Sequence, residues 1–292
     1  MNIFVNDYLK SIYGEKVYKL ALNAGMTCPN RDGSLSHKGC AFCSAQGSGD
    51  FATQCNAHNI HEQLQKAKNK ISTNHKCNKY IAYFQSFTNT YAPIDKLREL
   101  YTAAINEPDV VILSIATRCD CLPDDVLQLL RELNSIKPVW IELGLQSIHT
   151  QTLKNMNCCY DYAQFSDAVH RLHEAGITTI AHLILGLPHE THDMMKESVL
   201  QVCSLPIDGI KLQLLHVLKG TALEQMYYDD NFHIMDMEEY CTLVTECLHL
   251  IPSNIIVHRI TGDGPKDLLI EPRWSLDKKR VLNCINKKLN TL

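Results

Sequence analysis

Short apolar runs alternate along the chain with longer segments in which apolar residues recur at helical spacing. The apolar runs predict seven strands, at residues 16–22, 80–85, 110–116, 139–145, 178–186, 209–217 and 254–260. The segments between them repeat apolar residues at i, i+3, i+4 and i+7, as amphipathic helices do, at residues 60–71, 93–105, 123–136, 162–176, 191–204 and 237–251. Strands that alternate with helices predict an α/β fold with a parallel sheet, arranged as an open or complete βα barrel.

Polar residues recur on one face of several predicted strands. In the strand at 139–145, Glu142, Gly144 and the following Gln146 share a face, because side chains alternate with a period of two. Comparable positions on other strands are Tyr83, Gln85, Ser114, Arg118, His182, Lys211 and Gln213. A single buried polar residue is usually a satisfied core residue. Such residues on five strands instead favour a ligand-filled lumen, with the active site at the carboxyl ends of the strands.

Composition is that of a soluble globular protein. The 292 residues are 45% hydrophobic and 21% charged, which excludes a disordered or collagen-like chain. No apolar stretch approaches the roughly 18 residues of a membrane span, and polar residues interrupt the first apolar runs, unlike a secretory signal. We therefore expect a cytoplasmic protein.

The charge is unevenly distributed. The formal net charge is -4, yet residues 266–292 carry seven Lys or Arg against three Asp or Glu. Such a segment could contact a polyanion, or could be a solvated helix or tail, and charge alone leaves both open.

Thirteen cysteines in a chain expected to be cytoplasmic indicate metal ligation or buried packing, and disulfides explain them poorly. Cys28, Cys40 and Cys43 have the spacing C-x11-C-x2-C within a turn-rich loop. Two kinds of metal site remain open. One is a zinc site closed by His37 or Cys55; the other is an iron–sulfur cluster with one iron left for another ligand.

The run Cys40-Ala41-Phe42-Cys43 resembles the signature of the radical SAM superfamily. The longer runs TCPNRDGSLSHKGCAFC (27–43), YFQSFTNTYAP (83–93) and HRITGDGPKDLLIEPRWS (258–275) resemble its YhcC/YtqA-type branch. That branch is related to the Elongator catalytic subunit and to oxygen-independent coproporphyrinogen oxidases. The resemblance implies a partial (βα) barrel of the radical SAM type with an N-terminal cluster loop. We expect a core at residues 1–260 and a small C-terminal extension at 261–292.

The resemblance also implies the cofactors and their contacts. Cys28, Cys40 and Cys43 would hold a 4Fe-4S cluster whose open iron binds S-adenosylmethionine. A reduced cluster would then break a C–S bond of the cofactor to give a 5'-deoxyadenosyl radical, while the protein positions the reactants and excludes water. The implied contacts to S-adenosylmethionine are Gln85, Ser86, Asn89, Glu142, Gln146, His182 and Gly186.

One segment departs from the family pattern. Asn157-Cys158-Cys159-Tyr160-Asp161 stands where relatives usually have an Asn-Arg-Gly-His-Asp-like run. If that arginine pairs with the carboxylate of S-adenosylmethionine, a neutral thiol cannot replace it. Arg118 is then a candidate substitute for cofactor binding.

Three functions remain open. The resemblance favours an enzyme that modifies tRNA at the C5 side chain of the wobble uridine, with flavodoxin or ferredoxin as a possible reductant. A second possibility is a radical SAM enzyme with a small-molecule substrate, either porphyrin-like or another metabolite. The third is a non-catalytic protein that binds an iron–sulfur cluster or zinc.

Overall fold

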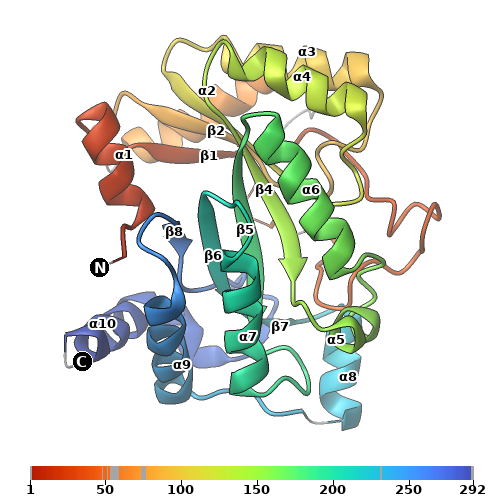
Figure 1. Cartoon of the computed structure of the whole chain (residues 1–292), viewed down its shortest axis with the longest axis vertical. Helices are drawn as coiled ribbons and strands as arrows, with labels where there is room; N and C mark the ends of the chain where they lie inside the picture. The colour runs from red at the N-terminus through yellow and green to blue at the C-terminus, as the bar shows by residue number, and fades with distance from the viewer. Residues whose placement is uncertain are drawn as a thin grey trace.

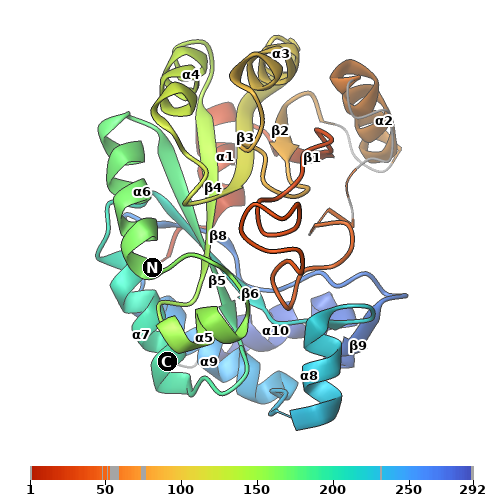
Figure 2. The same ribbon diagram turned by 90° about the vertical axis from the view of Figure 1, so that its right-hand side faces the viewer.

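Seven parallel strands form one curled sheet, an open half-barrel, in the computed structural model (Figures 1 and 2). The structure describes residues 2–47, 49–50, 52, 59–73, 77–230 and 232–290. The strand order is β1-β2-β3-β4-β5-β6-β8, and each neighbouring pair is parallel. Their bounds are β1 Tyr18–Leu22, β2 Tyr80–Phe84, β3 Val110–Arg118, β4 Val139–Gln146, β5 Thr178–Leu185, β6 Gly209–Leu214 and β8 Ile256–Arg259. The prediction of an α/β partial barrel is confirmed.

Helices connect successive strands and cover the outer face of the sheet (Figure 1). The predicted ones are α2 Ile60–Ser72, α3 Ile94–Ile105, α4 Asp124–Asn134, α6 Tyr162–Glu174, α7 His192–Cys203 and α9 Met237–Leu250. Local sequence sets their ends. Asp161 and Gln164 form a capping box at the start of α6, and Gly176 follows this helix with a left-handed φ of 69°.

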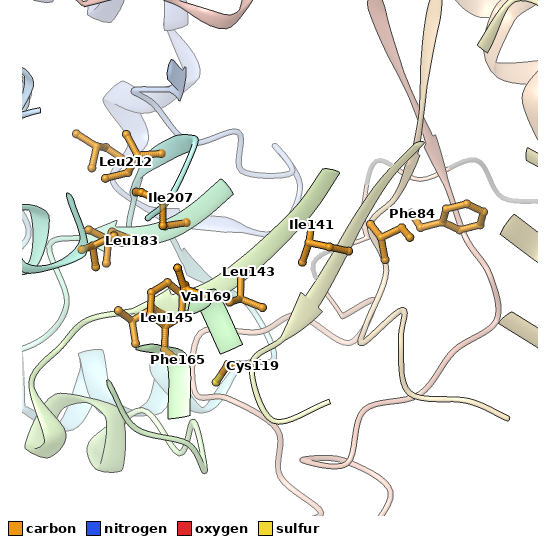
Figure 3. Close-up of a cluster of buried hydrophobic side chains, with 14 of the residues drawn as sticks. Phe84, Cys119, Ile141, Leu143, Leu145, Phe165, Val169, Leu183, Ile207 and Leu212 are labelled. Atoms are coloured by element: carbon orange, nitrogen blue, oxygen red, sulfur yellow. The ribbon is translucent and has the colours of Figure 1, made fainter. Parts of the chain in front are cut away.

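The hydrophobic core lies between the outer face of the sheet and these helices. Ile141, Leu143 and Leu145 of β4 are fully buried, and Leu143 and Leu145 lie beside Phe165 and Val169 of α6 (Figure 3). The odd-numbered residues of β4 are therefore buried against the helices on the outer face of the sheet, and its even-numbered residues face the lumen.

The structure contains elements that the apolar pattern did not predict. These are α1 Val5–Tyr13, α5 Thr150–Asn155, β7 Val217–Leu218, α8 Ala222–Asp230, β9 Leu269–Glu271, the 3₁₀ helix η1 Arg273–Leu276 and α10 Lys278–Leu289. The predicted strand at 209–217 ends early, at Leu214, because the chain then turns and pairs β7 with β9 in a small antiparallel sheet. No helix among the described residues is long and apolar enough to cross a membrane.

Helix α1 covers the end of the half-barrel where the strands begin. Phe4, just before it, pairs with Val257 of β8, so the start of the chain lies beside the last strand of the sheet (Figure 1). Leu9 of α1 and Val17 pack against an apolar layer formed by Ile81, Ile112, Trp140 and Ile180. Because apolar side chains fill this end, the polar lumen residues lie nearer the carboxyl ends of the strands.

Candidate cofactor and substrate site

A cavity of about 1230 Å³ occupies the lumen and extends to the loop that carries the three cysteines. Its wall combines the cysteine loop, the inward faces of the strands and part of α10. The predicted site residues on this wall are Cys28, Cys40, Cys43, Gln85, Arg118, Glu142, Gln146 and His182. Side chains from distant parts of the sequence are thus brought to one cavity.

The loop from Cys28 to Cys43, which we call the cluster loop, is held by a few polar side chains. The buried Asn30 amide donates to the carbonyl oxygen of Asn157 at 2.6 Å and to Sγ of Cys40 at 3.4 Å. Arg31 donates to the carbonyl oxygens of Cys43 and Ser44 at 2.9 and 2.7 Å. The conformation of the cluster loop is therefore stabilised by two side chains that belong to the loop itself.

The donor chemistry of the cluster loop fits an iron–sulfur cluster. The thiols of Cys28, Cys40 and Cys43 border the same cavity. Within the described residues, no three His, Cys, Asp or Glu side chains are close enough to hold a single metal ion. A cluster of several irons, held by Cys thiolates, does not require its ligands to converge on one point. His37, an alternative fourth ligand, is exposed, and Cys55 lies outside the described residues.

The segment after β2 contacts both sides of the cluster loop. The backbone N–H of Phe87 donates to Gly47 at 2.9 Å, and that of Thr88 donates to Thr27 at 3.2 Å. Asn89 is fully buried, and its side-chain amide donates to the carbonyl oxygens of Phe84 and Ala116. The segment therefore links the sheet to the residues that flank the cluster loop through hydrogen bonds.

Three predicted cofactor contacts stand apart from the cavity wall within the described structure. They are Ser86, Asn89 and Gly186. Ser86 is buried, and its hydroxyl lies so close to Gly49 that a Cβ atom on Gly49 would overlap it. Gly186 follows β5 with a φ of 94°, and a Cβ atom there would meet the side chain of Met235. Their assignment as contacts to S-adenosylmethionine stays a prediction.

Arg118 lies on the cavity wall but already has a carboxylate partner. Its Nε and Nη2 donate to both oxygens of Asp120 at 2.9 and 2.7 Å, and its guanidinium lies 4.8 Å from the ring centre of Tyr160. Burial opposes the charge, but Asp120 raises the pKa of Arg118 above its ordinary value. A second carboxylate at Arg118 would have to share the guanidinium with Asp120.

The segment that departs from the family pattern lies directly beside the cluster loop. Cys158 is fully buried in hydrogen-bond contact with Cys40, and this contact together with burial raises the pKa of the Cys40 thiol. Cys159 follows with a φ of 60°, the left-handed region in which glycine is favoured. The chain thus places a fourth thiol next to a predicted cluster ligand.

A set of charged and polar side chains from six strands meets in the lumen, and we call it the charged layer. Glu142 is at its centre: one carboxylate oxygen accepts hydrogen bonds from Lys19 and from Ser114 at 3.0 Å, and the other accepts from Lys211 and from His182 at 3.1 Å. Tyr83 completes the layer, with its ring centre 4.6 Å from Nζ of Lys19 and 5.1 Å from Nζ of Lys211.

The charged layer is deeply buried, and its groups shift one another's protonation. Burial alone would raise the pKa of Glu142, but Lys19 and Lys211 hold it well below its ordinary value. Burial, reinforced by the charge of Lys211, lowers the pKa of His182 to about 4. Glu142 is therefore an anion at neutral pH, and His182 is a neutral donor to it.

Lys19 and Arg259 are among the lumen residues that the sequence analysis missed. Lys19 follows the same period-two rule on β1 that identified Glu142 on β4, so the alternation could have revealed it. Arg259 is aligned with Lys211 across the pair β6 and β8. Its strand is only four residues long, which is too short for a clear alternation.

Comparison with known proteins places the chain in a family. The sequence model of the radical SAM superfamily matches residues 28–202, and the radical SAM C-terminal domain matches residues 207–291. The chain is 46% identical over 285 residues to YtqA of Bacillus subtilis, covering 98% of this chain and 88% of YtqA. It is 35% identical over 291 residues to YhcC of Escherichia coli, covering 99% and 92%.

More distant likenesses cover less. A tRNA uridine(34) acetyltransferase of Methanocaldococcus infernus is 26% identical over 165 residues, which is 55% of this chain and 30% of that protein. The M. infernus Elp3 structure with an N-terminal deletion superposes with a TM-score of 0.68 at 18% identity, covering 93% of this chain and 63% of that one. Coproporphyrinogen III oxidase (HemN) of E. coli gives 0.55 at 17% identity, covering 83% and 54%.

The matches to YtqA and YhcC extend over nearly the whole chain, and the family agrees with the cavity, its three thiols and the half-barrel around it. The predicted boundary between the core and the C-terminal extension, at residue 260, stays a prediction. The model of the C-terminal domain begins at residue 207, just before β6, and so does not mark this boundary. The chain belongs to the radical SAM superfamily, in the branch of YtqA and YhcC, and is a radical SAM enzyme with a 4Fe-4S cluster and S-adenosylmethionine as cofactors.

Proposed function

We propose that this enzyme acts in the cytoplasm on tRNA and remodels the C5 side chain of the wobble uridine. The observation that carries the proposal is the charge of the cavity wall. Of the described residues on this wall, seven are Lys or Arg and four are Asp or Glu, although the chain as a whole has a formal charge of -4. Excess positive charge at the cavity of an acidic protein favours an anionic substrate.

Cys28, Cys40 and Cys43 would hold the cluster, and Gln85, Gln146 and Arg118 on the adjacent wall would contact S-adenosylmethionine. When bound and reduced, the cluster supplies the electron that cleaves the cofactor and so starts radical chemistry. An external reductant such as flavodoxin or ferredoxin would deliver this electron. The protein orients the reactants, and its apolar layer keeps water from one end of the lumen.

Helix α10 places basic residues at the cavity. Lys278, Leu282 and Asn286 lie on its wall, and the neighbouring Lys279 and Arg280 are exposed. Phosphates flanking a uridine that enters the lumen could bind along this helix, because backbone phosphates supply most of the affinity for nucleic acid.

Similarity to a tRNA uridine(34) acetyltransferase supports the choice of tRNA. The likeness to coproporphyrinogen III oxidase concerns the fold alone and leaves a small-molecule substrate as the competing proposal.

The test compares modified nucleosides. Total tRNA from a deletion strain should lack a C5-modified wobble uridine or accumulate its precursor, as measured by nucleoside mass spectrometry. Complementation with the wild-type gene should restore the profile, whereas Cys40→Ala should not. An unchanged profile, with no salt-sensitive tRNA binding by the anaerobic holoenzyme, would contradict the proposal and favour a small-molecule substrate.

A further inference from the structure

A short stretch of chain after α5 is tied to the cluster loop on both sides of Cys40. The carbonyl oxygen of Met156 accepts a hydrogen bond from the backbone N–H of Ala41 at 2.9 Å. The side-chain amide of Asn157 donates to the carbonyl oxygen of Gly39 at 2.8 Å. Because these two bonds flank Cys40, they hold the backbone of this predicted cluster ligand against the stretch.

Cys158 follows in the same stretch and lies next to Cys40. Its side chain is 0% exposed, its backbone N–H donates to the carbonyl oxygen of Leu153 at 3.0 Å, and its Sγ is in hydrogen-bond contact with that of Cys40. Cys28, Cys40 and Cys43 border the cavity, whereas Cys158 is not on the cavity wall within the described residues. This fourth thiol therefore contacts a predicted ligand from outside the cavity.

Asn30 supplies a second hydrogen-bond donor to the same sulfur. Its side-chain nitrogen lies 3.4 Å from Sγ of Cys40, and its side-chain oxygen accepts from Sγ of Cys159 at 3.1 Å. Cys159 has a φ of 60°, which is a strained conformation for a residue with a side chain. The strained residue thus contributes a thiol that fixes which end of the Asn30 amide faces Cys40.

The direction of the contact between the two sulfurs follows from the chemistry of metal ligation. A cysteine binds iron as a thiolate, which accepts hydrogen bonds and has no proton to donate. When Cys40 is a ligand, the proton in its contact with Cys158 can therefore come only from Cys158. Reduction adds an electron to the cluster and increases the negative charge on its sulfur ligands. A donor at one of these sulfurs stabilises the reduced form more than the oxidised form.

We propose that Cys158 donates a hydrogen bond to the Cys40 thiolate of the bound cluster and thereby raises the reduction potential of the cluster. Asn30 acts on the same sulfur, and Cys159 orients Asn30. Cys158 is a positioning residue, because it lies outside the cavity wall and acts through Cys40. A cluster of higher potential takes its electron from a weaker reductant, so the thiol widens the range of electron donors that the enzyme can use.

Two other roles of Cys158 are outcomes of the test. As a fourth cluster ligand it would occupy the iron that S-adenosylmethionine needs, and its position outside the cavity wall argues against this role. As a small apolar residue it would only fill space in the hydrophobic core to which it belongs. Variants that separate the donor from the volume of the side chain distinguish these roles.

The experiment is a redox titration of anaerobically reconstituted protein with dithionite, followed by electron paramagnetic resonance of the reduced cluster. Cys158→Ala and Cys158→Val both remove the donor, and only the first leaves a cavity. Both should keep the full iron and sulfide content. At a fixed ambient potential we expect their ratio of reduced to oxidised cluster to be about threefold to tenfold below that of the wild type. This shift corresponds to about 30–60 mV, at 59 mV for each tenfold change. Cys158→Ser retains a donor and should stay closer to the wild type.

Cys247→Ala is the matched control. Cys247 is a fully buried thiol of α9 in the same hydrophobic core, so its removal perturbs packing without removing a donor at the cluster loop. It should leave the reduction potential unchanged. A fall as large as that in Cys158→Ala would show that the loss of any buried thiol disturbs the cluster, and would overturn the proposal.

Three further results would also overturn it. The first is an unchanged potential with full cluster content in Cys158→Ala and Cys158→Val. The second is a potential in Cys158→Ser as low as in Cys158→Ala, because packing would then be the cause. The third is loss of iron to background in Cys158→Ala and Cys158→Val with an unchanged circular dichroism spectrum, which would make Cys158 a ligand. The titration contains no RNA, so its result is independent of the proposed action on tRNA.

Discussion

The cluster loop and the charged layer border the same cavity but are built in different ways. The cluster loop places three cysteines within 16 consecutive residues and is shaped by its own Asn30 and Arg31. The charged layer takes one side chain from each of six strands, and its bond between Lys19 and Glu142 joins residues 123 positions apart. The first therefore depends on local turns, and the second depends on the curvature and register of the whole sheet.

The largest effect should come from the cluster loop. Replacing Cys40 by Ala removes one of three thiolate ligands and should reduce the iron and sulfide content of anaerobically reconstituted protein to background, with no cleavage of S-adenosylmethionine. Cys203→Ala, in a half-buried position on α7, is the control and should keep both. Full iron content in Cys40→Ala would show that the ligand assignment is wrong. Circular dichroism should show an unchanged fold in both variants.

The next effect should come from the centre of the charged layer. Glu142→Gln leaves Lys19 and Lys211 without their shared carboxylate, and we expect a loss of about 3–5 kcal/mol in the free energy of unfolding, measured with urea. Adding Lys211→Met to this variant should restore part of the loss, because it removes one uncompensated ammonium group. Glu132→Gln, in an exposed ion pair with Arg98, should change stability little. A double variant as unstable as Glu142→Gln would show that excess positive charge is not the cause.

Both regions could be predicted from sequence, but to different extents. The spacing of Cys28, Cys40 and Cys43 indicated a metal site directly, because the three cysteines lie close together in the chain, and the family resemblance implied that the metal site is a 4Fe-4S cluster. The apolar runs predicted all seven strands of the sheet, and period-two alternation predicted the inward direction of Glu142 and Lys211. It could not show that these two side chains meet, because that contact requires the sheet to curl.

Helix α1 was missed for a related reason. Its apolar residue Leu9 is buried only against a layer that four strands assemble. The end of β6 was placed three residues too late. The residues that follow it form β7, whose partner strand β9 is more than fifty residues away in the chain.

A third test uses pH to distinguish the two regions. The pKa of His182 is lowered to about 4 in the folded protein from an ordinary value of 6.5. The unfolded chain therefore binds more protons between these values, so the stability that is fully present above pH 6.5 is lost progressively as the pH falls toward 4. Between pH 6.5 and 5 this histidine should contribute a loss of about 2 kcal/mol, at about 1.4 kcal/mol for each pH unit.

Urea unfolding at both pH values checks this expectation. His182→Asn should flatten the dependence, whereas His37→Asn in the cluster loop, where the ring is exposed, should leave it unchanged. Equal slopes for wild type and His182→Asn would contradict the assignment.

The smallest effect should come from the polar support of the cluster loop. Asn30→Ala removes the bonds to Asn157 and Cys40 and should lower the free energy of unfolding by about 1–2 kcal/mol, with a partial loss of bound iron. Ser34→Ala removes only an exposed bond to Tyr91 and should retain the iron. Unaltered stability and iron content in Asn30→Ala would show that the loop does not depend on this side chain.

The position of α10 on the cavity wall bears on how this architecture can diversify. The three cysteines of the cluster loop all precede residue 202, whereas Lys211, Arg259 and Lys278 all follow residue 207. The first part thus carries the cluster loop and four of the seven Lys or Arg residues on the cavity wall, and the second part carries the other three. Because both parts line the lumen, exchanging residues 207–291 between two relatives should transfer only part of the choice of substrate and leave cofactor cleavage with the recipient. A new specificity therefore requires matched changes in two separate segments of the gene.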